Sequence, residues 1–375
     1  MFNSTLQWLS LKRKSSKRTS CRKVVFITFF FSLFSLIADA GAQQTSAISR
    51  ELHWAITEEK FELALERLRS EKTARSRIPV VLSHGLLVSS LFLNLDDEHS
   101  LARYLALEGF DVWNLSLRGT GRSLNPLKGG SKSWTLDDMI DKDIPAVIRY
   151  VQRESGSPRI VWVGYELGGL LLYGYLEKKG DSGLAALVTI AAPVTFTHPQ
   201  QEPIKRLLKI EESPTLKKAF LSLGAPFLGR LLIPLVPKME ALFYNRENID
   251  DDIKSKLLEE TLVDIHPGVL DHLLLMIKRG EFISADGKLS YRKNLAKIRV
   301  PMLLIGGEED KLAPPESIRV VYRNVSSTDR TLRIFGPRSK DSAAYGHIDL
   351  ILGKKAKREV FPVIARWLRQ RDRQE

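Results

Sequence analysis

Thiols, metal-binding patterns and nucleotide-binding patterns are scarce in this sequence. The 375 residues include one cysteine, Cys21, and it precedes an apolar run near the N-terminus. A chain cleaved after that run would contain no disulfide, no thiolate nucleophile and no cysteine metal site. The seven histidines are scattered without a ligand-spaced pair, so we expect no metal. No glycine-rich phosphate loop follows a strand-like segment, so we expect no nucleotide cofactor.

Hydrophobic runs long enough for a membrane span are also missing. The apolar run at residues 24–37 is shorter than the ~20 residues that a spanning helix prefers, and it follows a basic stretch ending at Lys23. Residues 38–40, Ala-Asp-Ala, then match a small-X-small cleavage signal. We therefore predict that residues 1–40 are a signal peptide of an exported protein, periplasmic or secreted. An N-terminal membrane anchor through residues 24–40 and an organellar transit peptide are the alternatives.

The chain is basic, with a formal net charge of +13. That charge is compatible with association with an anionic membrane surface. The sequence has no arginine-rich arm and no nucleic-acid-binding motif, so we interpret the charge as a solvated surface and expect no nucleic-acid partner. A hydrophobic content of 43% is ordinary for a soluble protein with a sizeable core.

Strand-like and helix-like segments alternate along most of the chain. Residues 54–69 predict a β-hairpin, because Phe61, Leu63 and Leu65 recur at every second position. Further strands are predicted at residues 78–82, 110–115, 160–163, 187–190, 302–305 and 332–335. Helices are predicted at residues 101–107, 136–151 with an interruption near Pro145, 167–176, 316–321 and 361–369. This alternation predicts an α/β fold with a mostly parallel sheet covered by helices on both faces.

The alternation is interrupted between about residues 195 and 294, where helical patterns and prolines dominate. We predict a helical cap inserted at residues 195–294, between core segments 41–194 and 295–375. A cap of this kind would cover an apolar pocket, so the predicted partner is a hydrophobic small molecule or a lipid-like ligand. The apolar residues of the cap include 231–237, Met239, Leu242, Phe243, Val269, Leu273, Leu274 and Ile277.

The most specific local pattern spans residues 163–169, Val-Gly-Tyr-Glu-Leu-Gly-Gly, directly after the apolar run Ile-Val-Trp at 160–162. A strand, then small-X-nucleophile-X-small, then a helix is the pattern of a nucleophile elbow. The small residues at 164 and 168 let the backbone turn sharply. The central position holds Glu166 where a lipase or esterase has serine. The pattern therefore predicts the fold and departs from its usual chemistry.

Four further motifs occur in a fixed order around the elbow. They are Leu-Ser-His-Gly-Leu-Leu at 82–87, Val-Trp-Asn-Leu-Ser-Leu-Arg-Gly-Thr-Gly-Arg-Ser at 112–123, the strand and acidic loop at 301–314, and Tyr-Gly-His-Ile-Asp-Leu at 345–350. With them, residues 54–370 resemble the α/β-hydrolase superfamily, in its acid-lipase-like and polyhydroxyalkanoate-synthase-like branches. The resemblance implies an α/β-hydrolase fold, and lipase- or esterase-like action on a hydrophobic ester or related small molecule. We interpret His84 as a structural residue that shapes its loop.

The resemblance also implies roles for particular residues. His347 would act as the general base, and Asp310, in preference to the two glutamates before it, would fix the tautomer of His347. The backbone N–H groups of Leu86 and Leu167 would form the oxyanion hole. The catalytic position of the elbow itself is occupied by Glu166.

Glu166 excludes serine acyl-enzyme chemistry, because no other serine stands in an elbow. Since Glu166 and Asp310 would both lie near His347, we expect the pKa of that histidine to be raised. Three interpretations remain. The protein is a catalytically inactive ligand-binding or scaffold protein of the same fold. Alternatively, Glu166 is the nucleophile, as an aspartate is in haloalkane dehalogenases and epoxide hydrolases, or a water held between Glu166 and His347 attacks the substrate.

Overall fold

The fold is built on one eight-stranded sheet with the order β1-β2-β4-β3-β5-β6-β7-β8. The computed structural model describes residues 48–71, 76, 78–123, 133–181, 183–205, 212–224, 226 and 237–372. The predicted leader at residues 1–40 lies outside them. The strands are β1 Ile48–Ile56, β2 Glu62–Ser70, β3 Val80–Ser83, β4 Val112–Leu115, β5 Ile160–Tyr165, β6 Leu184–Ile190, β7 Met302–Gly307 and β8 Arg330–Phe335.

The sheet is mostly parallel, as the alternation of elements predicted. All neighbouring pairs from β4 to β8 run parallel, whereas β1 and β2 form an antiparallel hairpin that joins the sheet through β4. Every residue of β3, β4, β5, β6 and β7 is buried. These strands consist largely of apolar residues because helices cover both of their faces.

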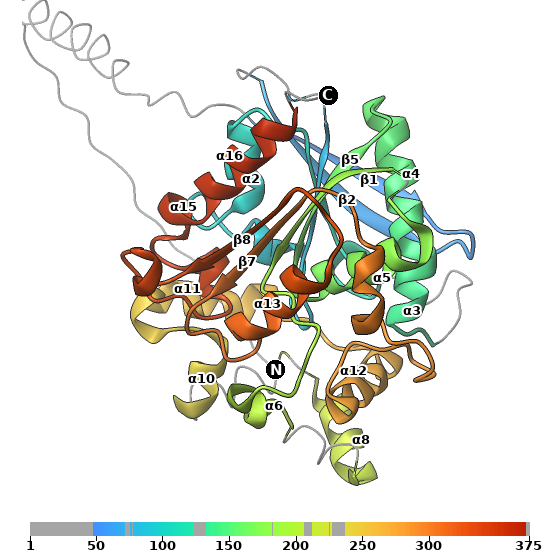
Figure 1. Cartoon of the computed structure of the whole chain (residues 1–375), viewed down its shortest axis with the longest axis vertical. Coiled ribbons are helices and arrows are strands. Elements are labelled where there is room, and N and C mark those ends of the chain that lie inside the picture. Colours follow the sequence, from blue (N-terminus) through green and yellow to red (C-terminus); the bar gives the residue numbers. More distant parts are fainter. Residues whose placement is uncertain are drawn as a thin grey trace, which may run out of the picture. The chain divides into compact units, whose positions relative to one another are not determined.

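Two helical layers flank the sheet. Helices α2 (Leu101–Leu107) and α16 (Phe361–Asp372) contact each other on one side, and α4 (Ile144–Ser155) contacts α5 (Leu167–Lys179) on the other (Figure 1). Helix α13 (Pro315–Asn324) packs on β7 and β8. The short helices α14 (Asp349–Leu352) and α15 (Ala356–Glu359) precede α16. This arrangement confirms the predicted α/β-hydrolase architecture.

The predicted helix at residues 136–151 is interrupted near Pro145, as expected. A first turn, α3 (Leu136–Asp138), continues into a π-helical turn at Met139–Asp143 before α4 begins. Pro145 lies in the first turn of α4, where its missing N–H breaks no helical hydrogen bond. The irregularity therefore lies just before the proline, and α4 begins regularly at it.

The segment between β6 and β7 is helical in its described parts. It contains α6 (Glu202–Lys205), α8 (Pro214–Leu223), α10 (Pro237–Phe243), α11 (Asp251–Lys256) and α12 (Pro267–Arg279), which lie together below the sheet in Figure 1. Helix α12 carries the predicted apolar stripe and buries Val269, Leu274 and Ile277. The apolar residues 231–236 lie outside the described part of the chain. The segment reaches the loop after β3, since Ser89 donates its N–H to the Thr261 carbonyl.

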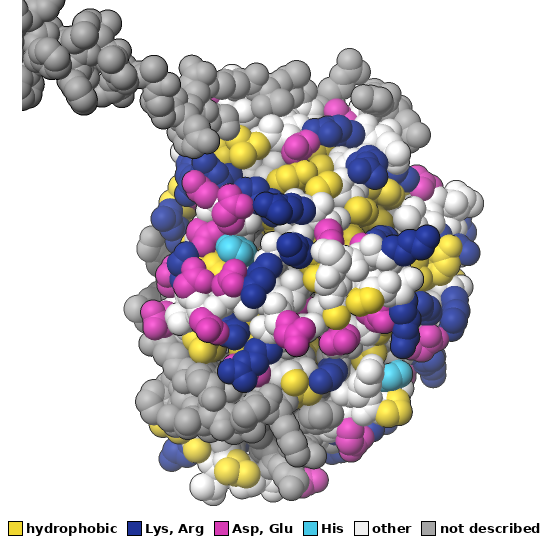
Figure 2. Space-filling view, turned by 90° about the vertical axis from the view of Figure 1, so that its left-hand side faces the viewer, with side chains coloured by type: hydrophobic (Ala, Val, Ile, Leu, Met, Phe, Trp, Pro, Cys, Tyr) yellow, Lys and Arg dark blue, Asp and Glu magenta, His cyan; other side chains and the backbone are white. Residues whose placement is uncertain are grey.

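The surface carries charges of both signs. Figure 2 shows Lys and Arg side chains interspersed with Asp and Glu side chains over one face of the molecule. Among the described residues, no helix combines the length and the apolar character that crossing a membrane requires.

Candidate active site

The sharp turn between β5 and α5 has the geometry of a nucleophile elbow. Glu166, the residue between them, has φ +48° and ψ −111°, a region that non-glycine residues rarely adopt. Glycines permit the close contacts of this turn. A Cβ atom on Gly164 would lie 2.4 Å from the Gly168 backbone, and one on Gly168 would lie 2.4 Å from the Ser83 carbonyl oxygen. The strained turn presents the Glu166 side chain at the carboxyl end of the sheet.

The Glu166 carboxylate reaches the loop that follows β3. Its Oε2 atom accepts a hydrogen bond of 2.6 Å from the backbone N–H of Leu86. Leu86 is one of the two predicted oxyanion donors. The other, Leu167, is the first residue of α5, so its N–H has no acceptor within its own helix. A carboxylate oxygen of the chain itself therefore accepts the N–H of Leu86 that the resemblance assigns to a substrate oxyanion.

Asp310 and His347 form a complete hydrogen-bonded pair. Asp310 follows β7 and is fully buried. Its Oδ2 accepts from His347 Nδ1 at 2.8 Å, and its Oδ1 accepts from the N–H groups of Leu312 and Ala313 at 2.9 and 2.7 Å. With Nδ1 donating to the carboxylate, Nε2 of His347 is the nitrogen left for proton exchange. The preceding Glu308 forms an ion pair with Arg338 at 3.1 Å.

Nearby carboxylates raise the pKa of the His347 imidazole. Burial by itself lowers its pKa, but the charge and hydrogen bond of Asp310, with the charges of Glu166 and Asp349, raise the pKa above its ordinary value. The direction agrees with the sequence-based expectation. A histidine in this environment favours the imidazolium form, which is a poor general base.

Asp349 is a site residue that the sequence analysis gave no role. Its buried carboxylate accepts hydrogen bonds from the N–H of Gly346 at 2.9 Å and from Asn248 Nδ2 at 2.9 Å. Burial raises its pKa to about 6, against these hydrogen bonds. Asp349 thus joins the histidine loop to the segment after α10. In the sequence, the one indication that Asp349 belongs to the site was its position two residues after His347.

His84 organises the neighbouring Arg-Gly loop. Its Nδ1 donates to the Gly85 carbonyl at 2.8 Å, and its Nε2 accepts from the Leu117 N–H at 3.1 Å. Burial lowers its pKa to about 4, so the ring is neutral and can make both contacts at once. His84 therefore has the structural role that the sequence suggested.

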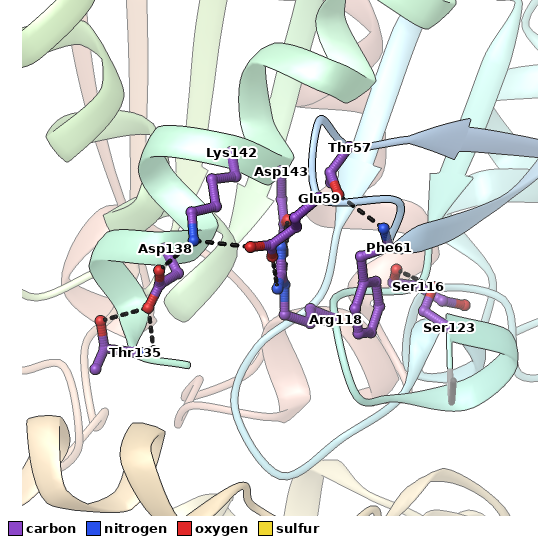
Figure 3. Close-up of polar contacts among 10 residues, drawn as sticks. All are labelled: Thr57, Glu59, Phe61, Ser116, Arg118, Ser123, Thr135, Asp138, Lys142 and Asp143. Carbon is purple, nitrogen blue, oxygen red and sulfur yellow. Dashed lines mark hydrogen bonds and ion pairs between the residues drawn. The ribbon is translucent and has the colours of Figure 1, made fainter. Parts of the chain in front are cut away.

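Arg118 anchors the same loop in a buried ion network (Figure 3). Its Nε and Nη2 atoms both donate to Asp143, with an Nε–Oδ2 distance of 3.0 Å, and Nη1 pairs with Glu59 in the β1–β2 turn. Lys142 donates to the second oxygen of Glu59 at 2.8 Å. The guanidinium carbon lies 4.4 Å from the centre of the Phe61 ring. The network ties the Arg-Gly loop to the hairpin and to the π-helical turn.

A small cavity lies next to Leu86 and Leu167, the two predicted oxyanion donors. A cavity of about 40 Å³ borders the oxyanion loop and the start of α5, whereas pockets for small molecules usually measure about 300–1,000 Å³. Trp134 and His266 stack at 3.6 Å on its polar side. The apolar wall is formed by Leu86, Leu87, Leu117, Leu167, Ile265 and Val269.

Comparison with known proteins identifies the family. The family described as "Serine aminopeptidase, S33" matches residues 74–336. The chain belongs to this family. Among curated proteins, this S33 chain is 25% identical to triacylglycerol lipase 1 of Arabidopsis thaliana over 355 residues, 84% of this chain and 86% of the relative. It is 26% identical to gastric triacylglycerol lipase of Rattus norvegicus, which covers 82% of this chain and 85% of the relative.

Solved structures agree with this assignment at the level of fold. An esterase from Thermogutta terrifontis superposes with a TM-score of 0.58 at 18% identity, covering 86% of this S33 chain and 99% of its own. The monoacylglycerol lipase of Paleococcus ferrophilus gives a TM-score of 0.54 at 20% identity, covering 83% and 99%. The predicted superfamily and the lipase- and esterase-like character of the protein are therefore confirmed. The roles of Glu166, Asp310, His347, Leu86 and Leu167 stay predictions.

Proposed function

We propose that this protein binds a neutral, hydrophobic ester-like or lipid-like molecule and does not hydrolyse esters by the serine mechanism. The hydrogen bond from the Leu86 N–H to Glu166 Oε2 carries this proposal. Serine-type hydrolysis requires a hydroxyl nucleophile and a free oxyanion hole. Glu166 stands at the position of the hydroxyl nucleophile. Its carboxylate also accepts the N–H of Leu86, which is a predicted donor of the oxyanion hole.

The ligand class follows from the site and from the relatives. The names of the relatives describe lipases of acylglycerols. Six of the fifteen residues that line the cavity next to the oxyanion loop are leucine, isoleucine or valine, beside Met139 and Trp134. A ligand larger than a water molecule or two requires the wall formed by Ile265 and Val269 to move outward. The wall belongs to the segment between β6 and β7, which supports the proposal that residues 195–294 act as a cap.

A second candidate function uses Glu166 as a nucleophile. The intact Asp310–His347 pair favours it. Glu166 Oε1 would attack an sp³ carbon and form a glutamyl ester. With an alkyl halide the carbon–halogen bond breaks and halide leaves; with an epoxide one ring C–O bond breaks, and the alkoxide stays on the substrate and takes a proton from the His347 imidazolium. A water deprotonated by neutral His347 would then attack Cδ, placing the oxyanion on Oε2 beside Leu86, and collapse would break the ester bond to the alkyl group, release the alcohol with the proton from His347 and restore the Glu166 carboxylate. Ester formation removes the charge of Glu166, one of the causes that raise the pKa of His347, so the base would become effective after alkylation.

Nitrophenyl esters of short and long acyl chains test the leading proposal. We expect the wild-type protein to retain a long-chain ester intact and saturably in equilibrium dialysis. Ester turnover that disappears in His347→Ala would contradict the proposal, as would the absence of saturable retention.

Alkyl halides and epoxides test the second candidate. In a His347→Gln variant the ester intermediate would persist, so mass spectrometry would find the added mass on the peptide that contains Glu166. His84→Gln serves as the control, because His84 organises a loop and faces no reacting carbon. Finding no adduct with any substrate consumed by the wild type would exclude this chemistry.

We also propose that residues 1–40 direct export and are removed. The short apolar run at 24–37 and the Ala-Asp-Ala sequence after it support this proposal. The N-terminal sequence of the native protein tests it. A chain that begins near residue 41 is expected, and one that begins at residue 1 would favour the membrane anchor.

A further inference from the structure

The outer strand β1 carries an exposed apolar stripe. Leu52, Trp54 and Ile56 are 42%, 38% and 59% exposed, and they are three of the six large apolar residues that are exposed in the described part of the chain. All three project from the same face of the strand, because they are two residues apart. Among the described residues, β1 is the terminal strand of the sheet and β2 is its one neighbouring strand. A long apolar edge strand is a preferred site for pairing with another strand.

In the described part of the chain, no second strand pairs with the outer side of the β1 backbone. Thr57 donates its N–H to the Phe61 carbonyl at the start of the hairpin. Bonded positions alternate along an antiparallel pair, so Ala55 and His53 face β2, and the N–H and C=O groups of Leu52 and Trp54 point to the open edge. In agreement, the Trp54 N–H lies against the Tyr150 hydroxyl instead of a β2 carbonyl.

We infer that β1 pairs antiparallel with β1 of a second copy of this chain, about a two-fold axis at Leu52. The strand runs from Ile48 to Ile56, so Leu52 is its midpoint. Full overlap then places every residue of the strand opposite a residue of the partner strand. It also places the outward-facing backbone groups of the two strands opposite each other, as an antiparallel ladder requires. The sheet would continue across the axis in an isologous dimer.

The side chains of β1 are self-complementary in this register. Leu52 meets its own copy at the axis, and Ile48 lies opposite the partner's Ile56. Arg50 lies opposite the partner's Trp54, where a guanidinium can rest on the indole face. Glu51 lies opposite the partner's His53, a pair of opposite or hydrogen-bonding character. No like charges oppose each other.

A second strand suits this edge better than a lipid surface. A bilayer can cover the apolar stripe but offers no partners for the open N–H and C=O groups, whereas a strand satisfies both. Residues of both signs flank the stripe, with Arg50 at one end and Glu58 at the other, which fits a protein partner better than an anionic membrane. Pairing would displace the contact of the Trp54 N–H with Tyr150 of α4, a helix that packs on β1.

Charge reversal at the axis tests the dimer and its register together. We expect the full chain to have twice the mass of one chain in light scattering at micromolar concentration. Leu52→Lys and Leu52→Glu should each raise the dissociation constant at least about tenfold, because each substitution meets its own charge. An equimolar mixture of the two variants should restore the dimer. Leu216→Lys, at a leucine of α8 that is 52% exposed against 42% for Leu52, is the matched control and should leave the wild-type mass unchanged.

Several outcomes would overturn this inference. A monomeric wild type, a dimer that survives Leu52→Lys, or a mixture that fails to reassociate would each do so. A dimer held together by residues 1–40 would also survive Leu52→Lys, so it too would contradict the inference. Vesicle binding of a monomeric wild type that Leu52→Lys abolishes would assign the stripe to a lipid surface instead. Thermal melting of each variant checks the fold, which should hold because Leu52 is exposed.

Discussion

The two halves of the site differ in how much of a lipase-like arrangement they keep. In the half formed by Asp310 and His347, the carboxylate holds the imidazole and two backbone N–H groups. In the half formed by the elbow and the oxyanion loop, the backbone keeps its strained turn, but Glu166 bonds to Leu86. The comparison shows that the strained turn and the Asp310–His347 pair occur together with a carboxylate of the protein bound to Leu86.

The substitution Glu166→Ser should have the largest effect on this comparison. It would free the Leu86 N–H and place a hydroxyl at the elbow, within an otherwise complete arrangement. We expect nitrophenyl ester hydrolysis to rise at least about 10³-fold over the wild type. The double variant Glu166→Ser/His347→Ala should lose the gain. If Glu166→Ser stays inert, the elbow half has changed at more than one residue.

Removal of Arg118 should test how firmly the elbow half is supported. Arg118→Ala leaves Asp143 buried without its partner, so we expect the free energy of unfolding to fall by about 3–5 kcal/mol in urea titrations. Arg338→Ala, which removes the exposed ion pair with Glu308, is the control and should cost less than about 1 kcal/mol. Equal losses in the two variants would show that the buried network does not stabilise the fold.

A buried carboxyl near the C-terminal end of α5 makes the stability of the fold depend on pH. Burial raises the pKa of Glu177 from 4.5 to about 9, opposed by Lys297, and neither carboxyl oxygen has a partner among the described residues. The pKa of this carboxyl is higher in the folded than in the unfolded chain. The free energy of unfolding therefore falls as the pH rises between these two values. Glu177→Met should therefore raise the free energy of unfolding by about 1–3 kcal/mol at pH 8 and by less at pH 5. A gain that is the same at both pH values would contradict this origin.

The smallest predicted effect concerns the histidine half. Asp349→Asn removes one of the negative charges that raise the pKa of His347, so that pKa should fall in an NMR titration of the imidazole. Glu359→Gln, which alters a carboxylate bonded to Tyr345 in the same loop, serves as the control and should leave the His347 titration in place. An unchanged titration in Asp349→Asn would show that Asp349 does not affect the pKa of His347 and only holds the loop through its hydrogen bonds.

The sheet could be predicted because its signals are local. Apolar runs marked the strands from β3 to β8, and small residues at 164 and 168 marked the elbow. Only short-range sterics are needed to infer a sharp turn from glycines. The hairpin of β1 and β2 followed in the same way from the alternation at Phe61, Leu63 and Leu65.

The pairing of Asp310 with His347 was predicted from the resemblance, but two other contacts of the site were not, because they join distant parts of the chain without a motif that marks both partners. Leu86 and Glu166 are 80 residues apart, and Asn248 and Asp349 are 101 residues apart. The sequence places Glu166 at the elbow. It does not determine which group the Glu166 carboxylate contacts, because this side chain is longer than serine and can point in several directions. The π-helical geometry of the turn before Pro145 was not predicted for a related reason. The turn packs against a distant part of the chain, where Asp143 accepts hydrogen bonds from Arg118.

The hydrogen bond between Leu86 and Glu166 also bears on ligand selectivity. A free fatty acid would bring its own carboxylate to a place where the protein already holds Glu166, with Asp310 and Asp349 close to the same histidine. Repulsion between like charges in a buried site disfavours such a ligand. The site should therefore discriminate by charge, accepting uncharged esters and alcohols and rejecting the anions that ester hydrolysis releases.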